Sequence, residues 1–324
     1  MITFLQVKNH DSYKMSTEPI RKYLSSKGYE TEIIDVINQI PNPNCKIIIS
    51  NYSWATNKLK LNFDIKVPTI LIFHGISIWK PLENHFKNYE YAFLASNFEK
   101  GKVFRFKDNF PKEENTIITG WPKLDILYEK LKNKEEIKKN IYKKYKLDTG
   151  KPIVAFLPTF KHSDARICGT AEMLSSPHFS KIENLIVSLH YFDTTKENII
   201  EYMKKYPFIW KDHDKYDLLI AADIIIGDLS SVLVEALPLD KPIIHLLNKE
   251  DQLYAYQNKE NGICKFGDIC LDPKDLQSLI DINLEKDLNK DQRNKWKDIL
   301  ILNFGQAAVE AGEQIISILK SKES

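Results

Sequence analysis

The sequence predicts an α/β protein of two doubly wound halves that face each other across a cleft. Its 324 residues suffice for two domains of about 150 residues each. Short apolar segments alternate with amphipathic segments along the chain, as in repeated β/α units. The apolar segments are continuous, which is typical of strands covered by helices on both faces of a parallel sheet. Ligand sites of such sheets lie beyond the carboxyl ends of the strands, so residues that follow strands are the first candidates for function.

The first half contains six strand-like segments. A helix is expected over residues 17–27, because Gly28 supplies the stop signal that commonly ends a helix. The expected strands are residues 2–7, 31–36, 46–49, 69–73, 91–94 and 116–118. This alternation predicts one α/β domain.

A basic stretch separates the two halves. Residues 128–146 contain eight Lys and three Glu, a net charge of +5 in a chain of net charge +2. One apolar stripe runs along the stretch, so we expect an amphipathic helix. We place the domain boundary here, giving domains 1–147 and 148–324, with the terminal helices able to pack back on the first domain.

A second β/α series follows the basic stretch. The expected strands are residues 153–157, 184–189, 223–226 and 242–246. The expected helices are residues 214–222, 230–237, 274–283, 290–302 and 307–320. The second half therefore predicts another doubly wound sheet.

Composition excludes several classes of protein. With 46 basic and 44 acidic residues, the chain lacks the basic excess of an ordinary nucleic-acid binder. No run of about 18 apolar residues is present, and the first residues lack a basic leader and a cleavage site, so we expect neither a membrane span nor a signal peptide. The four Cys form no C-x-x-C pair and are expected to be reduced. A cytoplasmic location follows as an expectation.

Ser230 and Ser231 open the expected helix 230–237, directly after a strand. The unpaired N–H groups of a helix start, together with two hydroxyls, can bind a phosphate group. The alternative is that Asp228 or Ser230 only caps the helix. The chain has neither a G-x-x-x-x-G-K-[ST] loop nor a G-x-G-x-x-G turn, which excludes an ATP-hydrolysing P-loop and a dinucleotide fingerprint.

Two histidines and a lysine also follow strands. His74 precedes Gly75, which lets the backbone turn sharply, and an imidazole there suits proton abstraction from a hydroxyl at neutral pH. Lys161 is placed to meet an anion, and His190 closes the strand 184–189. Each also has a plain structural interpretation: a hydrogen-bonded histidine in a turn, or a solvated lysine. The turn 119–125 is expected to be mainly architectural.

Together these segments resemble the CDP-glycerol glycerophosphotransferase family of teichoic acid and capsule synthesis, over residues 70–315. The family patterns H-G-T-x-x-K, T-G-x-P-R-x-D, P-T-W-R, K-L-H-P and T-D-Y-S-S are similar, in this order, to residues 74–80, 119–125, 158–161, 188–191 and 227–231. Lys123 and Lys161 replace arginines of the patterns, and one residue more than in the family pattern separates His74 from Lys80. The segment 241–244 and Asp251 also resemble the family.

The resemblance implies a GT-B fold of two Rossmann-like domains and a transfer reaction. A glycerol phosphate, or a related polyol phosphate, would pass from a CDP-activated donor to a hydroxyl of a lipid-linked acceptor, with release of CMP. His74 would be the general base in the acceptor-side domain. The pyrophosphate of the donor would be held by His190, Lys161, Ser230 and Ser231. The other candidate binding residues are Thr159, Asp228, Gly75, Lys80 and Asp251, with Asp228 expected to orient its loop.

The resemblance implies no required metal ion and no cofactor. Because the acceptors of this family are usually lipid-linked, the chain would work at the inner face of the cell membrane. The basic helix 128–146 would then contact anionic lipid, and the alternative is a solvated linker helix. Nucleic acid is not an expected partner.

Three other functions stay open on the sequence. A GT-B glycosyltransferase would hold a nucleotide sugar with the same residues, and attack would occur at carbon. A sugar-nucleotide epimerase of similar fold would need a pair of acid/base carboxylates, which we do not find. A binding or scaffold protein without catalysis is disfavoured, because the candidate residues all follow strands.

Overall fold

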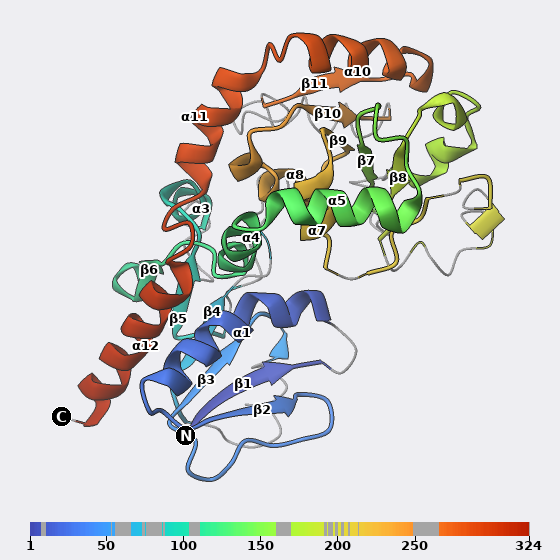
Figure 1. The fold of residues 1–324 in the computed structure, drawn as a ribbon. Helices are drawn as coiled ribbons and strands as arrows, with labels where there is room; N and C mark the ends of the chain where they lie inside the picture. Colours follow the sequence, from blue (N-terminus) through green and yellow to red (C-terminus); the bar gives the residue numbers. More distant parts are fainter. Residues whose placement is uncertain are drawn as a thin grey trace. The chain divides into compact units, whose positions relative to one another are not determined.

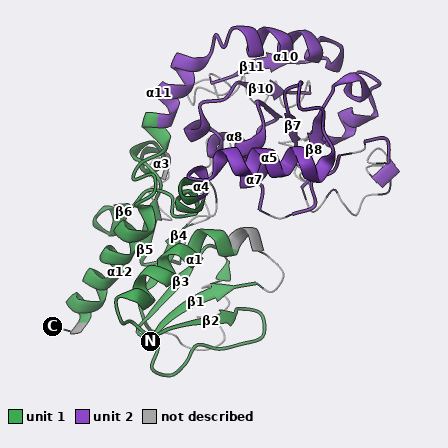
Figure 2. Ribbon diagram, in the orientation of Figure 1, with its two compact units in different colours: residues 1–129, 298–324 green, residues 130–297 purple. Residues whose placement is uncertain are grey.

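The protein is described from a computed structural model. It describes residues 1–7, 11–52, 54–55, 66–72, 75, 86, 88–103, 111–159, 170–190, 193, 197, 200–201, 204–206, 208–212, 214–248 and 266–323. The chain forms two compact units, which Figure 2 shows in different colours. Unit 1 comprises residues 1–129 and 298–324, and unit 2 comprises residues 130–297.

Unit 1 contains a six-stranded sheet in which every neighbouring pair is parallel, in the order β2-β1-β3-β4-β5-β6 (Figure 1). The strands are β1 (Ile2–Gln6), β2 (Thr31–Asp35), β3 (Ile47–Ser50), β4 (Thr69–Ile72), β5 (Tyr91–Leu94) and β6 (Thr116–Ile118). All six strands expected from the sequence are present. Strands β3 and β4 are buried along their whole length, as their continuous apolar sequences predict.

Helices accompany the sheet of unit 1. They are α1 (Asp11–Ser26), α3 (Asn97–Val103), α4 (Lys123–Leu131) and α12 (Ala307–Glu323). Helix α12 packs against α1 and closes one apolar face of the sheet, where Ile315 and Leu319 join Phe4 and Ile20 in a single core. Helix α1 begins earlier than expected, and α3 was not expected.

Unit 2 contains a five-stranded parallel sheet in the order β11-β10-β9-β7-β8. The strands are β7 (Val154–Leu157), β8 (Leu185–Val187), β9 (Ile224–Gly227), β10 (Ile243–Leu246) and β11 (Asp268–Cys270). The edge strand β11 was not expected. Chain order runs outward from β7 in both directions, so the topological switch point of this sheet lies between β7 and β9.

The helices of unit 2 are α5 (Lys134–Tyr145), α7 (Tyr216–Ala221), α8 (Ser231–Glu235), α10 (Leu276–Glu285) and α11 (Lys290–Leu300), the last of which continues into unit 1. Short 3-10 turns occur in both units: Glu113–Asn115, Ala171–Ser175, Phe179–Lys181, Leu237–Leu239 and Pro273–Asp275. Two parallel sheets with covering helices confirm the predicted α/β class.

The basic stretch 128–146 is not one helix, and most of it belongs to unit 2. Helix α4 ends at Leu131 and α5 begins at Lys134. Helix α5 packs on α7, with Lys138 paired to Asp223 and Tyr145 stacked on Trp210 at 6.2 Å between ring centroids. These contacts place α5 in unit 2, so the division differs from the expected boundary after residue 147. The first crossing between units follows residue 129, and residues 298–324 return to unit 1.

The turn 119–125 holds this returning segment. Asn303 Nδ2 donates to the Thr119 carbonyl at 3.1 Å, and the Asp125 carboxylate accepts from the first two N–H groups of α12, at 3.2 and 2.7 Å. Gly120 has a φ of +84°, and a Cβ there would collide with the Leu302 carbonyl oxygen. The turn is therefore an anchor for the C-terminal chain within unit 1.

Within the part of the chain that the structure describes, none of the helices combines the length and apolar character needed to cross a membrane.

Candidate functional site

The carboxyl edge of the unit 2 sheet brings together three groups of residues singled out from the sequence. Because all five strands are parallel, their carboxyl ends meet at one edge. Thr159 follows β7, His190 follows β8, and the segment 227–231 ends β9 and opens α8. Strand β7 lies between β8 and β9, so these residues gather around the topological switch point, where open α/β sheets bind ligands.

Asp228 is the structural centre of this edge. Its side chain is fully buried. The carboxylate accepts hydrogen bonds from the Thr159 N–H at 2.9 and 3.0 Å, from the Thr170 N–H at 3.1 Å and from the Thr170 hydroxyl at 3.0 Å. Both oxygens are therefore occupied by groups of the protein, and Asp228 does not present a surface to a phosphate. It joins the two residues that flank the segment 160–169.

Thr170 was missed by the sequence analysis. It is fully buried and supplies two of the donors to Asp228, although 58 residues separate the two in sequence. No local motif marks such a pairing. The one usable signal is chemical: a carboxylate between a strand and a helix start needs donors, and buried threonines carry them.

Ser230 and Ser231 are both partly exposed at the start of α8. Ser230 is the N-cap, and its hydroxyl accepts from the Val232 N–H at 3.4 Å, so the capping interpretation holds for this residue. Helix α8 has five residues, ending at Glu235 rather than at 237 as expected. A helix this short carries a small dipole, so any anion affinity here must come from the hydroxyls and backbone N–H groups themselves.

His190 is partly exposed beyond β8. Its carbonyl accepts from the Asp193 N–H at 2.9 Å, which turns the chain back after the strand. Two residues earlier, the Ser188 N–H donates to the Phe156 carbonyl on β7 at 2.9 Å. The β7–β8 pairing thus extends almost to His190 and fixes the backbone from which the imidazole projects.

A second histidine lies beneath the same edge. His245 is on β10, opposite Gly227 in the parallel register with β9, and is fully buried. Its ring packs edge-on against Phe266, with the ring centroids 4.9 Å apart. Burial lowers the pKa of His245 to about 4, so the imidazole is neutral at physiological pH. In the sequence this residue is visible only as part of the predicted strand 242–246.

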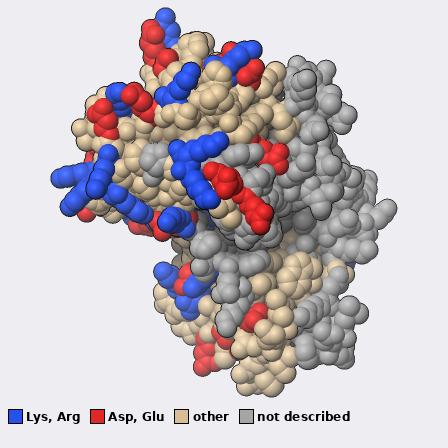
Figure 3. All heavy atoms as spheres, turned by 90° about the vertical axis from the view of Figure 1, so that its right-hand side faces the viewer, with Lys and Arg blue, Asp and Glu red and all other residues tan. Residues whose placement is uncertain are grey.

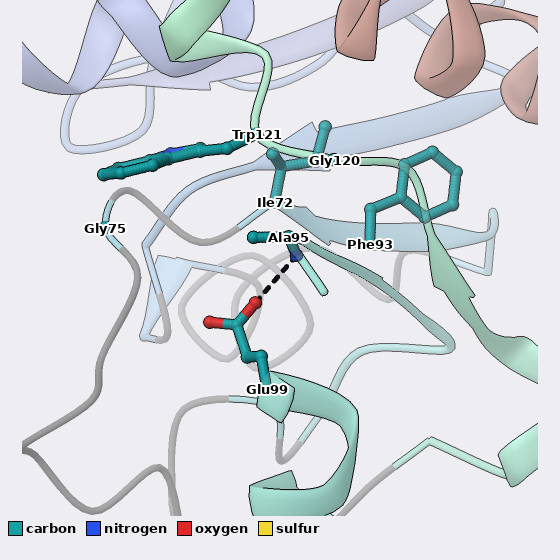
Figure 4. Close-up of a pocket in the computed structure, with 7 residues that line it drawn as sticks. All are labelled: Ile72, Gly75, Phe93, Ala95, Glu99, Gly120 and Trp121. Carbon is teal, nitrogen blue, oxygen red and sulfur yellow. Dashed lines mark hydrogen bonds between the residues drawn. The ribbon is translucent and has the colours of Figure 1, made fainter. Parts of the chain in front are cut away.

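In unit 1, Gly75 lines a small pocket at the carboxyl edge of the sheet (Figure 4). Four candidate residues lie outside the described residues, namely His74, Lys80, Lys161 and Asp251. Among the residues that are described, no three His, Cys, Asp or Glu side chains gather as metal ligands would.

Comparison with known proteins adds a family and a fold. The family model described as "CDP-Glycerol:Poly(glycerophosphate) glycerophosphotransferase" matches residues 49–299. Teichoic acid glycerol-phosphate primase of Bacillus subtilis is 28% identical over 249 residues, which are 74% of this chain and 61% of that protein. Across the curated relatives that match, the chain spans between 25% and 61% of their length.

Solved structures of the wall teichoic acid polymerase TagF have the same fold. One of them, a histidine-to-asparagine variant soaked with CDPG, matches with a TM-score of 0.71 and 17% identity, covering 100% of this chain and 89% of that chain. UDP-GlcNAc 2-epimerase from Neisseria meningitidis, bound to UDP-GlcNAc, matches with a TM-score of 0.67 and 12% identity, covering 98% and 99%. These likenesses confirm the GT-B fold expected from the sequence.

Proposed function

Because the chain belongs to the CDP-glycerol:poly(glycerophosphate) glycerophosphotransferase family, we propose that it transfers a polyol phosphate from a CDP-activated donor. Glycerol phosphate is the favoured group, and the acceptor is a hydroxyl of a lipid-linked saccharide or polyol in teichoic acid or capsule-type synthesis. The observation that carries the proposal is the family match over residues 49–299, which includes all five motifs.

The reaction is a displacement at the phosphorus that bears the polyol. The acceptor oxygen forms a new bond to this phosphorus, and the bond from phosphorus to the bridging oxygen of CMP breaks. The bridging electron pair leaves with CMP, and the proton of the acceptor hydroxyl passes to the imidazole of His74. Such transfers depend on orientation and on stabilisation of charge more than on covalent catalysis.

On the donor side, we assign the pyrophosphate to the carboxyl edge of the unit 2 sheet. Ser230 and Ser231 are partly exposed there, and His190 follows β8, which is separated from β9 by β7. Lys161 belongs to the segment whose flanking residues Asp228 joins. Asp228 is a positioning residue in this proposal, since its carboxylate is enclosed by the protein. Gly75, Lys80 and Asp251 are further substrate-binding candidates by resemblance.

We also propose that no metal ion is required, as the family resemblance implies. Lys161 and His190 would instead stabilise the charge that develops on the leaving CMP. Transfer measured with and without EDTA tests this, and a loss of activity restored by Mg²⁺ would contradict it.

The experiment for the proposed function is a donor screen. We expect CMP release from CDP-glycerol or CDP-ribitol in the presence of acceptor, and none from UDP-sugars, which would instead indicate a glycosyltransferase or an epimerase. His74→Ala should lower kcat by about 100-fold or more, and added imidazole should restore part of it. Near-normal transfer by His74→Ala would contradict the assignment of the base.

A membrane surface is the proposed working place, at the cytoplasmic face where the lipid-linked acceptor is held. Figure 3 shows Lys and Arg side chains over the described surface, with Asp and Glu among them. On α5, Lys138 and Lys144 are paired with Asp223 and Asp212, whereas Lys139 and Lys143 are exposed. Each Lys near an anionic surface contributes about 1 kcal/mol.

Flotation with anionic vesicles tests the membrane proposal. The double variant Lys139→Glu and Lys143→Glu leaves the Lys138–Asp223 and Lys144–Asp212 ion pairs intact and should reduce the bound fraction, whereas vesicles of neutral lipid should bind neither protein. Equal flotation of the variant and the parent would leave α5 as a solvated helix of unit 2.

A further inference from the structure

Thr170 is a fully buried residue that directly precedes the 3-10 turn Ala171–Ser175. A threonine at the start of a helical turn commonly caps it, with its hydroxyl accepting from a backbone N–H of the turn. Thr170 makes no such side-chain cap. The turn is closed through the backbone, where the Thr170 carbonyl accepts from the Met173 N–H at 3.0 Å. Starting this turn is therefore not what the hydroxyl does.

The hydroxyl and the N–H of Thr170 both donate to the Asp228 carboxylate. They reach the same oxygen, Oδ2, at 3.0 and 3.1 Å. The Thr159 N–H donates to both oxygens of the carboxylate, at 3.0 and 2.9 Å. Hydrogen bonds to an ionised carboxylate are stronger than bonds between neutral groups, and they stabilise its charged form. Thr170 thus supplies two donors to one buried negative charge.

Asp228 lies in the short turn between β9 and α8 that also carries Ser230 and Ser231. This turn lies close to the end of β7, because a Cβ on Gly227 would be 3.1 Å from the Leu157 carbonyl oxygen. Asp228 follows Gly227 directly and can therefore reach the residues beyond β7. The buried charge is only two residues from the first of the two serines.

A negative charge at this place works against the binding of an anion. Like charges repel more strongly where water is excluded, so a carboxylate turned toward the serines would lower the affinity for a diphosphate. The Asp228 side chain is instead fully buried, whereas Ser230 and Ser231 are partly exposed. The bonds from Thr170 hold the carboxylate in this buried orientation and offset part of its charge.

We propose that Thr170 is a positioning residue for the donor diphosphate, because its hydroxyl holds the Asp228 carboxylate away from the phosphate-binding serines. The inference rests on the proposed function, which assigns the diphosphate to Ser230 and Ser231. Thr170 acts through Asp228 and does not touch the substrate. Loss of its hydroxyl should therefore weaken the binding of the charged part of the donor and leave the binding of the nucleoside part unchanged.

The binding test compares CDP with cytidine, by calorimetry on the full chain. Thr170→Val keeps the backbone N–H and removes the hydroxyl. We expect the Kd for CDP to rise about 10-fold, as for loss of one hydrogen bond to a charged group, with the Kd for cytidine unchanged. Thr170→Ser keeps the hydroxyl and should bind CDP as the parent does. A distorted fold would weaken the binding of both ligands.

Tyr206→Phe is the matched control. The Tyr206 hydroxyl is buried and donates to the Leu174 carbonyl at 2.6 Å, in the 3-10 turn that follows Thr170. The substitution removes a buried hydroxyl from the same region without removing a donor to Asp228, so both dissociation constants should stay at the parent values. In an Asp228→Asn background, Thr170→Val should no longer raise the Kd for CDP, because the charge is absent.

Four outcomes would overturn the proposal. They are an unchanged Kd for CDP in Thr170→Val, an equal rise for CDP and cytidine, the same rise for CDP in Tyr206→Phe, and a full effect of Thr170→Val in the Asp228→Asn background.

A parallel series with UDP and uridine separates this proposal from the proposed function. A parent chain that binds UDP and not CDP would refute the CDP-activated donor, while a selective loss of UDP affinity in Thr170→Val would still support the role of Thr170. A parent chain that binds neither nucleotide would refute both.

Discussion

Replacing Asp228 by Ala should destabilise unit 2 by about 4 kcal/mol. The substitution leaves three buried donors without their acceptor: the Thr159 N–H, the Thr170 N–H and the Thr170 hydroxyl. Each buried donor left unbonded costs about 1 to 3 kcal/mol, so three give about 3 to 9 kcal/mol. Water entering the vacated space can satisfy some of them, which favours the lower half of this range.

Urea unfolding followed by circular dichroism measures the loss, and hydrogen exchange of peptides from β7 and β9 assigns it to unit 2. Thr170→Val removes one donor and leaves the carboxylate its other partners, so it should cost about 1 kcal/mol. Thr159→Val is the matched control, because Thr159 reaches Asp228 through its backbone N–H. The reasoning is refuted if Asp228→Ala costs less than Thr170→Val, or if the two threonine variants cost the same.

Three further predictions concern His245, Gly120 and Lys241. His245 has a pKa of about 4 in the folded chain against 6.5 when unfolded, so the unfolded chain binds more protons between these two pH values. The free energy of unfolding should therefore decrease by about 3 kcal/mol as the pH drops from 6.5 to 4. Urea titrations at each pH should show no such decrease in His245→Phe. Gly120→Ala should lower the stability of unit 1 by about 2 kcal/mol or more in urea unfolding, because φ is positive and the added Cβ meets backbone, whereas Gly101→Ala, in open space on α3, should be neutral or stabilising. Lys241 donates to three carbonyls at the end of α7, so Lys241→Met should cost about 3 kcal/mol, and a midpoint equal to the parent's would contradict this role.

The strands other than β11 were predictable because their signal is local. Runs such as 47–50 and 224–227 are apolar at nearly every position, and only a strand buried on both faces needs that pattern. The domain division was harder to predict, because it depends on contacts between segments that are far apart in sequence. The apolar stripe of α5 predicts that the helix packs, but its partner α7 lies some seventy residues later, and no local pattern names it.

The candidate site shows the same contrast. Residues that follow strands were found because topology alone carries them to one edge, as with Thr159, His190 and Ser230. The loop-orienting role of Asp228 could be predicted, because a carboxylate beside a phosphate is repelled. The positions of Thr170 and His245 at the site became evident only from tertiary contacts.

The return of residues 298–324 to unit 1 sets an order of assembly. Unit 2 is continuous in sequence, whereas the unit 1 core needs Ile315 and Leu319 from α12 to cover Phe4 and Ile20. During synthesis the ribosome therefore releases the strands of unit 1 before unit 2, but the core of unit 1 is complete only after α12 has been made. Until then its open apolar face is exposed, while unit 2 has already received all of its residues. Of the two units, the one whose synthesis begins earlier is thus completed later.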